Sequence, residues 1–189
     1  MKKIIQTLSL MGVLATSTSL FAHSESFQPA FVDTLVTPYL AMQSALAADD
    51  LKAAQTGATA FLEAIKQAPK AEDAQAEAAD LSAPVTKIAQ AEDLKTAREA
   101  FHVLTPDLMS MVKHVGVSNE QALYVAHCPM AFSGKGADWM QSDKTIANPY
   151  YGSKMLRCGS VKSQLAGEKV HDKHQEKASG KDQHSGHQH

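Results

Sequence analysis

The sulfur-bearing residues of the C-terminal third are the first candidates for chemistry in this chain. Both cysteines, Cys128 and Cys158, lie there, with Met130 two residues after the first and Met155 three residues before the second. Thiolate and thioether sulfur are soft ligands that select Cu(I), and Ag(I) has a similar preference. These residues therefore predict a soft-metal site, with His127 beside Cys128 as a further candidate ligand.

A second group of metal-binding residues lies at the very end of the chain. Five of the nine histidines follow residue 170, and they are His171, His174, His184, His187 and His189. Short histidine tracts bind Cu(II), Ni(II) or Zn(II). The residues around them are mostly Lys, Gln, Glu, Gly and Ser, so we expect residues 163–189 to be a disordered tail. The tail is predicted to collect metal loosely, as an accessory to the sulfur site.

The N-terminus has the layout of a secretory signal. Lys2 and Lys3 precede an apolar stretch, Ile4–Leu14, and Phe21-Ala22 provides a small residue for cleavage. We therefore predict a signal peptide over residues 1–22. Two lysines without arginine suit bacterial export, which places the mature protein in the periplasm.

The sequence of the mature chain predicts neither a membrane-spanning helix nor a nucleic-acid-binding surface. A membrane-spanning helix needs about 20 apolar residues, and no stretch after residue 22 of that length lacks charges. Loss of Lys2 and Lys3 lowers the formal net charge from −2 to −4. Such a chain lacks the basic surface that nucleic-acid binding requires.

Export also gives the two cysteines an alternative role. In an oxidising compartment a disulfide is the common state of paired cysteines. A bond between Cys128 and Cys158 would stabilise the fold by about 3–4 kcal/mol in the chain-entropy model, and Met130 and Met155 would then be packing residues. The sequence leaves metal site and disulfide both open.

Residues 27 to about 116 carry apolar side chains at helical spacing, which predicts an antiparallel bundle of about four helices. Asp50 and Asp93 are expected to cap helices, and Gly116 to end the last one. Residues 71–81 are expected to form a short helix, with a fresh start at Ser82 and Pro84. Kinks or breaks are expected at Pro38 and Pro106.

The composition changes after Val117. Residues 122–126 are read as a short strand or extended piece, and residues 122–162 as an irregular segment rich in glycine and aromatic residues. The predicted fold class is all-α, with residues 23–162 as a single helical domain that includes this Cys/Met segment.

Catalysis has no visible basis in the sequence. No nucleophile, base and orienting group stand out as a set, and neither a haem-attachment motif nor a glycine-rich phosphate loop is present. His102 and His114 on the last long helix are expected to be surface or packing residues, and Arg98 to pair with a carboxylate from another helix. We expect a binding protein and not an enzyme.

The chain resembles the domain of unknown function 3347 family. The likeness rests on Tyr124-x-x-x-Cys128-Pro129-Met130, Gly134-x-Gly136-Ala137-x-Trp139, Asn148-Pro149-Tyr150-Tyr151-Gly152-x-x-Met155-Leu156-x-Cys158-Gly159 and, upstream, Pro38-Tyr39-Leu40, Ala45-Leu46-Ala47-Ala48-Asp49-Asp50 and Arg98-x-x-Phe101. It covers roughly residues 29–162.

Such domains occur as small exported proteins and fused to periplasmic adaptor subunits of copper and silver efflux systems. The resemblance therefore implies a protein that binds or buffers Cu(I) or Ag(I), and whose partner is a periplasmic efflux adaptor or a metallochaperone. Carried over residue by residue, it implies Cys128, Met130, Met155 and Cys158 as ligands. The family pattern does not require His127, and the histidine tail lies outside it.

Overall fold

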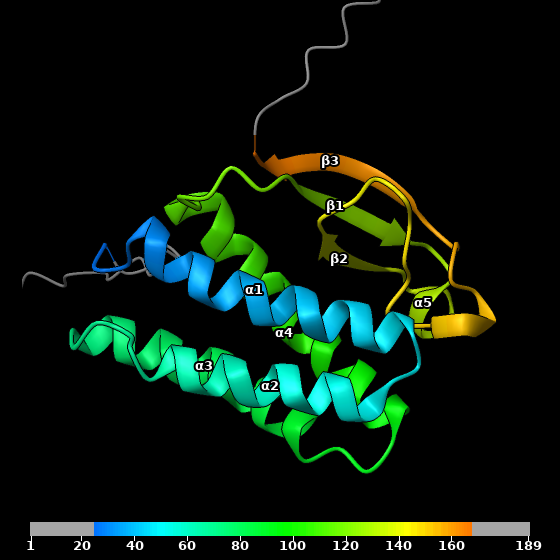
Figure 1. The fold of residues 1–189 in the computed structure, drawn as a ribbon, viewed down its shortest axis with the longest axis horizontal. Helices are drawn as coiled ribbons and strands as arrows, with labels where there is room; N and C mark the ends of the chain where they lie inside the picture. The colour runs from blue at the N-terminus through cyan, green and yellow to red at the C-terminus, as the bar shows by residue number, and fades with distance from the viewer. Residues whose placement is uncertain (1–24, 168–189) are drawn as a thin grey trace, which may run out of the picture.

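The computed structural model describes residues 25–167. The predicted signal peptide and the five tail histidines lie outside these residues, as does most of the predicted tail. Within residues 25–167 no helix combines the length and the apolar character needed to cross a bilayer. The described chain forms a helical part followed by a small sheet, which lies along one side of the helices (Figure 1).

Four helices dominate the fold, and successive helices run in opposite directions (Figure 1). Their bounds are α1 Pro29–Ala47, α2 Leu51–Ile65, α3 Glu72–Ala89 and α4 Leu94–Val115. Each helix packs on the next, and α4 returns to contact α1. The predicted four-helix bundle is therefore confirmed.

Local signals in the sequence set several helix ends. The side chain of Asp50 accepts a hydrogen bond from Ala53 N at 2.9 Å, and that of Asp93 accepts one from Thr96 N at 2.7 Å. Both bonds satisfy backbone donors that the first turn of a helix leaves unpaired. Gly116 follows the last residue of α4, as expected.

The predicted fresh start at Ser82 and Pro84 is wrong, because α3 continues through Pro84 to Ala89. Pro38 and Pro106 likewise lie inside α1 and α4. A hydroxyl shortly before each proline donates to the carbonyl four residues back: Thr37 to Asp33, Ser82 to Ala78, and Thr105 to Phe101. Burial of the apolar faces keeps the helices continuous despite the missing proline N–H groups.

The all-α prediction needs correction, because the C-terminal part holds a three-stranded antiparallel sheet. Its strands are β1 Leu123–Cys128, β2 Ala137–Gln141 and β3 Ser160–Ala166, in the order β2-β1-β3. β1 is buried along almost its whole length, so it lacks the alternation that marks a strand covered on one face. β3 continues to Ala166, past the predicted domain boundary at residue 162.

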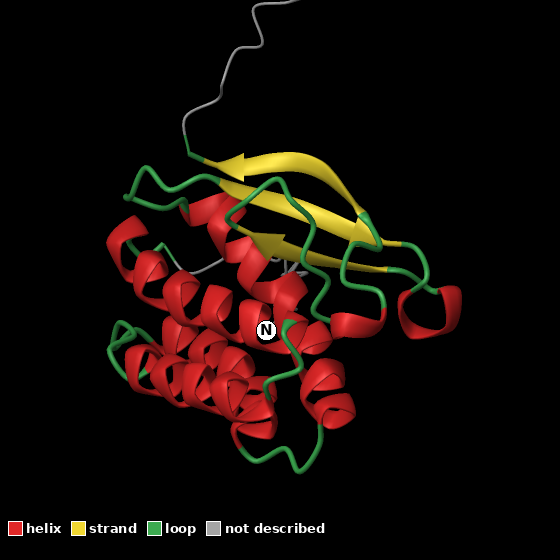
Figure 2. Ribbon diagram, turned by 45° about the vertical axis from the view of Figure 1, so that its right-hand side comes forward, coloured by secondary structure: helices red, strands yellow, loops and turns green. Residues whose placement is uncertain are grey.

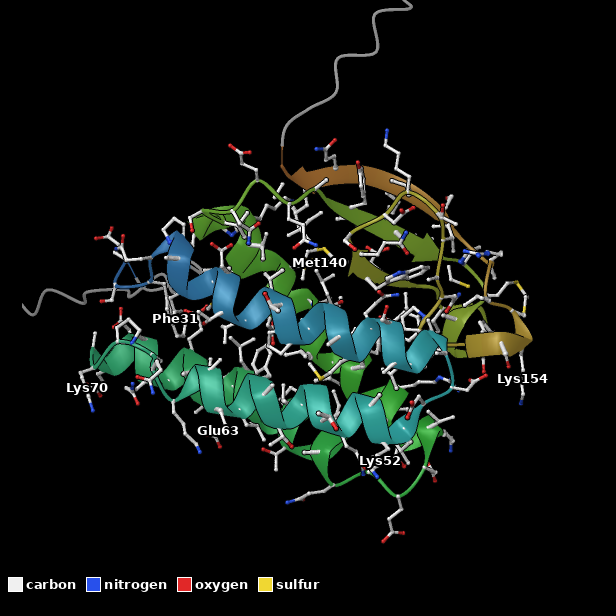
Figure 3. All side chains as sticks on the ribbon, in the orientation of Figure 1. Phe31, Lys52, Glu63, Lys70, Met140 and Lys154 are labelled. Carbon is white, nitrogen blue, oxygen red and sulfur yellow. The ribbon has the colours of Figure 1, made fainter. Side chains whose placement is uncertain are left out.

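The sheet and the helices share one core. Met140 of β2 lies between the sheet and α1 (Figure 3), is fully buried, and donates its backbone N–H to the hydroxyl of Tyr39 at 3.2 Å. That hydroxyl also bonds Thr105 of α4 at 2.9 Å, and burial raises the pKa of Tyr39. A buried hydroxyl thus joins α1, α4 and β2, which fixes the sheet on the bundle.

Residues 142–159, here called the strap, cross one face of the sheet between β2 and β3 (Figure 2). They include a short 3-10 helix, η1 Gly152–Lys154. Tyr150 of the strap meets the fully buried Trp139 edge-on, with ring centroids 5.9 Å apart. This contact anchors the strap on the shared core.

Candidate metal centre

The register of the sheet brings the two cysteines together. β1 ends at Cys128, and His127 pairs with Ser160 of β3, so Cys158 at the end of the strap arrives beside Cys128. The two Sγ atoms lie 3.0 Å apart. Cys128 is fully buried, whereas Cys158 is half-buried. The pair therefore has one sulfur anchored in the core and one near solvent.

The separation of 3.0 Å lies between the values required by the two predicted roles. A disulfide needs about 2.05 Å between the sulfur atoms. Two thiolates on a tetrahedral metal, with bonds of about 2.3 Å, would lie roughly 3.8 Å apart. Either state requires the sulfur atoms to shift by about 1 Å.

The neighbouring sulfur also affects the proton on Cys158. The hydrogen bond to Cys128, partial burial and the charge on Cys128 all raise the pKa of the Cys158 thiol. Because the thiolate is the metal ligand, a bound cation must displace this proton. Metal affinity at the pair should therefore rise with pH.

Three large apolar side chains are exposed in residues 25–167, and two of them are Met130 and Met155. Their solvent-accessible fractions are 54% and 40%. Tyr151 donates its hydroxyl to the carbonyl of Met130 at 2.6 Å. Cys158 N donates to the carbonyl of Met155 at 2.9 Å. These bonds fix both methionine backbones next to the cysteines and leave the thioethers at the surface. Their role as ligands stays a prediction.

Asn148 holds the strap in the shape that delivers Cys158, and it is fully buried. Its Nδ2 donates to the carbonyl of Cys158 at 2.8 Å, and its Oδ1 accepts from Tyr150 N and Tyr151 N at 2.8 and 3.1 Å. Its backbone N–H donates to Leu156 O at 2.9 Å. Only its place in the family-like motif marked this residue in the sequence.

A second contact ties the strap to the helices. Arg98 of α4 donates to the carbonyl of Pro149 at 2.8 Å and to Asp49 Oδ1 at 2.5 Å, and Ser153 N donates to Asp49 Oδ2 at 2.9 Å. The bonds from Ser153 and Arg98 lower the pKa of Asp49 from 3.8 to about 2. The expected carboxylate partner of Arg98 is thus Asp49, in the turn between α1 and α2. A Cβ on Gly152 would collide with both of these side chains.

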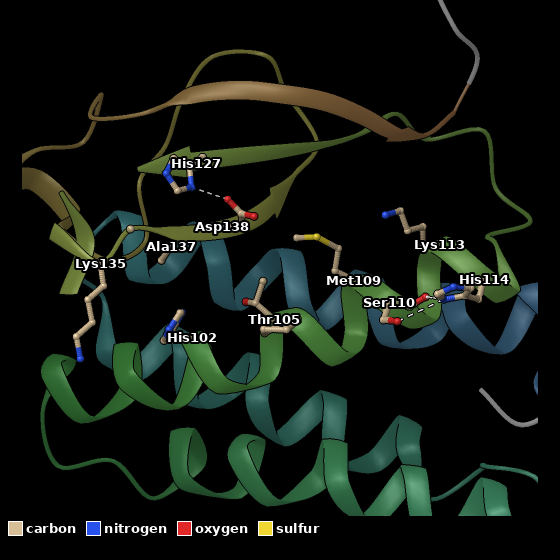
Figure 4. A pocket seen from close by; sticks show the side chains of 12 residues that line it. His102, Thr105, Met109, Ser110, Lys113, His114, His127, Lys135, Ala137 and Asp138 are labelled. Atoms are coloured by element: carbon tan, nitrogen blue, oxygen red, sulfur yellow. Dashed lines mark hydrogen bonds and ion pairs between the residues drawn. The ribbon is translucent and has the colours of Figure 1, made fainter. Parts of the chain in front are cut away.

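His127 faces the other side of the sheet from Cys128, because adjacent residues of a strand alternate. Its Nδ1 bonds Asp138 Oδ1 at 2.6 Å, and Lys162 Nζ lies 3.5 Å from both carboxylate oxygens. The ring lines a groove between the sheet and α4, which His102 and His114 also line (Figure 4). The structure therefore places His127 with Asp138 and away from the thiol pair.

No group of three or more His, Cys, Asp or Glu side chains in residues 25–167 is arranged to hold a metal ion. Any metal at the cysteines would need thioether or external ligands besides the two thiolates.

His102 is packed rather than free: its ring stacks on Phe132 with centroids 4.4 Å apart, and burial lowers its pKa.

Residues 35–120 match the family described as "Protein of unknown function (DUF3347)". The chain is similar to that family over this stretch. The predicted resemblance is confirmed for α2, α3, α4 and most of α1. The match ends before β1, so the DUF3347 region builds the helices that support the sheet, while the cysteines follow it. Comparisons with curated proteins and with solved structures gave no match.

Proposed function

We propose that this protein binds one Cu(I) or Ag(I) ion through Cys128 and Cys158 and buffers that metal in the periplasm. The observation that supports this proposal is the pair itself: two thiols from separate elements lie 3.0 Å apart, one buried and one half-exposed. Two thiolates suit a soft monovalent cation, which tolerates few ligands.

Met130 and Met155 complete the proposed ligand set. Both side chains are exposed and lie within three residues of a cysteine in the sequence, which supports their thioethers as ligands from the solvent side. An exposed sulfur rim would also let an efflux adaptor or a metallochaperone approach with its own ligands. The histidine tail, outside the described residues, is proposed as a separate collector of Cu(II), Ni(II) or Zn(II).

The test is a Cu(I) titration in competition with a bicinchoninate chelator, under reducing conditions. The mature chain with its five tail histidines replaced by Gln should bind one Cu(I). Cys128→Ser and Cys158→Ser should each weaken binding by more than about 100-fold, since even outer-sphere changes around a metal cost about 10–100-fold. Affinity should increase with pH, because the raised pKa of Cys158 opposes loss of its proton.

Met109→Leu is the matched control, because Met109 lines the groove between α4 and the sheet and not the thiol pair. It should leave the Cu(I) affinity unchanged. If the protein with both cysteines replaced binds Cu(I) as tightly as the parent, the ligand assignment is wrong.

A disulfide between the same cysteines is the second candidate, and the short sulfur separation favours it. In that state the protein would be a helical interaction module whose strap is locked to β1. A thiol count on protein taken from the periplasm separates the candidates. Absence of free thiols whether or not copper is supplied would support the disulfide, and thiols protected only with copper would support the metal site.

A further inference from the structure

A groove between α4 and the sheet is a feature that the thiol pair does not explain. It has a volume of about 460 Å³, which lies within the range of about 300–1,000 Å³ for small-molecule sites. Thr105, Pro106 and Met109 of α4 line one wall, and Ala137 of β2 lies on the other (Figure 4). These side chains give the groove a mostly apolar surface.

His127 is held in a fixed position at this groove. Its Nδ1 is bonded to Asp138 at 2.6 Å, which leaves Nε2 as the atom available for another partner. A Cβ on Gly136 would lie 2.8 Å from Cε1 and 3.1 Å from Nε2 of the ring. Gly136 also has a φ of 78°, so the backbone there combines a turn with close approach to the imidazole.

The charges around the groove favour an anion. Asp138 is the acidic residue of its lining, and both His127 and Lys162 lie against that carboxylate. Lys113 of α4 and Lys135 before β2 also line the groove, and no acidic side chain within residues 25–167 forms an ion pair with either. In Figure 4 the amino group of Lys113 points along the groove.

We propose that this groove binds a small organic anion with an apolar body, such as an aryl carboxylate or sulfonate. Lys113 takes the anionic group, and Pro106 and Met109 pack on the body. Charge complementarity and the apolar wall select this class of ligand over a neutral one. The site lies across the sheet from Cys128, so it is independent of the proposed metal binding.

The test compares two fluorescent probes of similar shape on the mature chain. 8-Anilinonaphthalene-1-sulfonate carries a sulfonate, and N-phenyl-1-naphthylamine is its uncharged analogue. The sulfonate should bind more tightly than the amine by about tenfold, and Lys113→Gln should weaken sulfonate binding about fivefold. Lys87→Gln, an exposed lysine of α3, should change neither probe's affinity.

Met109→Glu places a carboxylate in the groove and should abolish sulfonate binding while the circular dichroism spectrum stays that of the parent. Equal affinity for the two probes would overturn the proposal. So would a sulfonate affinity that Lys113→Gln and Met109→Glu both leave unchanged.

Discussion

Cys128 and His127 are neighbours in β1, yet they belong to different faces of the sheet and to different surroundings. The strap covers the face of Cys128 and brings a second sulfur to within 3.0 Å. The opposite face is open to a groove, where His127 is oriented by Asp138. Neighbours in a strand therefore need not share a site, whereas Cys128 and Cys158 share one although they are 30 positions apart in the sequence.

The two faces also differ in what holds them. The sulfur face depends on the strap, which buried polar contacts fix at Asn148, Arg98 and Asp49. The groove face depends on an ion pair between His127 and Asp138 that is about one-third exposed. Substitutions in the strap should therefore cost more stability than substitutions at the groove, and should expose Cys158 selectively.

The largest effect is expected from Gly152→Ala. The added Cβ would overlap Asp49 and Arg98, and Gly152 has a positive φ of 57°. We expect a loss of about 3 kcal/mol in the free energy of unfolding, measured by urea denaturation. Gly134→Ala is the control: it has a φ of 84° but open space around it, so it should cost about 1 kcal/mol. Equal losses in the two variants would show that the contacts of Asp49 and Arg98 with the strap contribute little to stability.

Asn148→Ala should lower the free energy of unfolding by about 2 kcal/mol, because buried backbone groups of Tyr150, Tyr151 and Cys158 lose their partners. The Cys158 thiol should react about tenfold faster with a disulfide reagent, since the strap end is released. Asn119→Ala, in an exposed loop, should not change this rate. An unchanged rate in Asn148→Ala would mean that Asn148 does not position Cys158.

Acid should weaken the contact between Asp49 and the strap. The pKa of Asp49 is lowered from 3.8 to about 2, so its ionised form contributes stability that is complete above about pH 4 and is lost as the pH falls toward 2. Asp49→Asn should flatten the pH dependence of unfolding in that interval. Asp80→Asn, an exposed acid on α3, should keep the parent's profile. If Asp49→Asn keeps the parent's pH dependence of unfolding, ionised Asp49 does not stabilise the strap.

The smallest effect is expected from Asp138→Asn. The pair with His127 is about one-third exposed, so we expect a change in stability below about 1 kcal/mol. Nitrogen-15 NMR should show that the proton on His127 Nδ1 is no longer fixed, while the reactivity of Cys158 stays that of the parent. A large change at Cys158 would mean that the two faces are coupled.

The helical half of the fold was accessible from sequence because its signals are local. Apolar residues repeat at helical spacing, and Asp50 and Asp93 sit where caps are needed. Pro84 misled the prediction, because burial of the helix face outweighs the missing N–H.

The sheet and the site were less accessible because they depend on pairing between distant residues. β1 has almost no exposed side chain to set an alternation, and β3 is an edge strand with mostly polar residues. Residue type alone identified Cys128 and Cys158 as candidates, but the register of β1 and β3 places them next to each other. The pairing of His127 with Asp138 likewise follows from the β1–β2 register, which no local motif encodes.

Copper K-edge X-ray absorption tests the central claim most directly. The sample is the mature chain loaded with one equivalent of Cu(I), with its five tail histidines replaced by Gln. The account predicts a first shell of sulfur alone, with bonds of about 2.3 Å, that disappears when Cys128 and Cys158 are both Ser. A shell containing imidazole nitrogen, unaffected by these substitutions, would contradict the assignment of the metal to the strap-covered face.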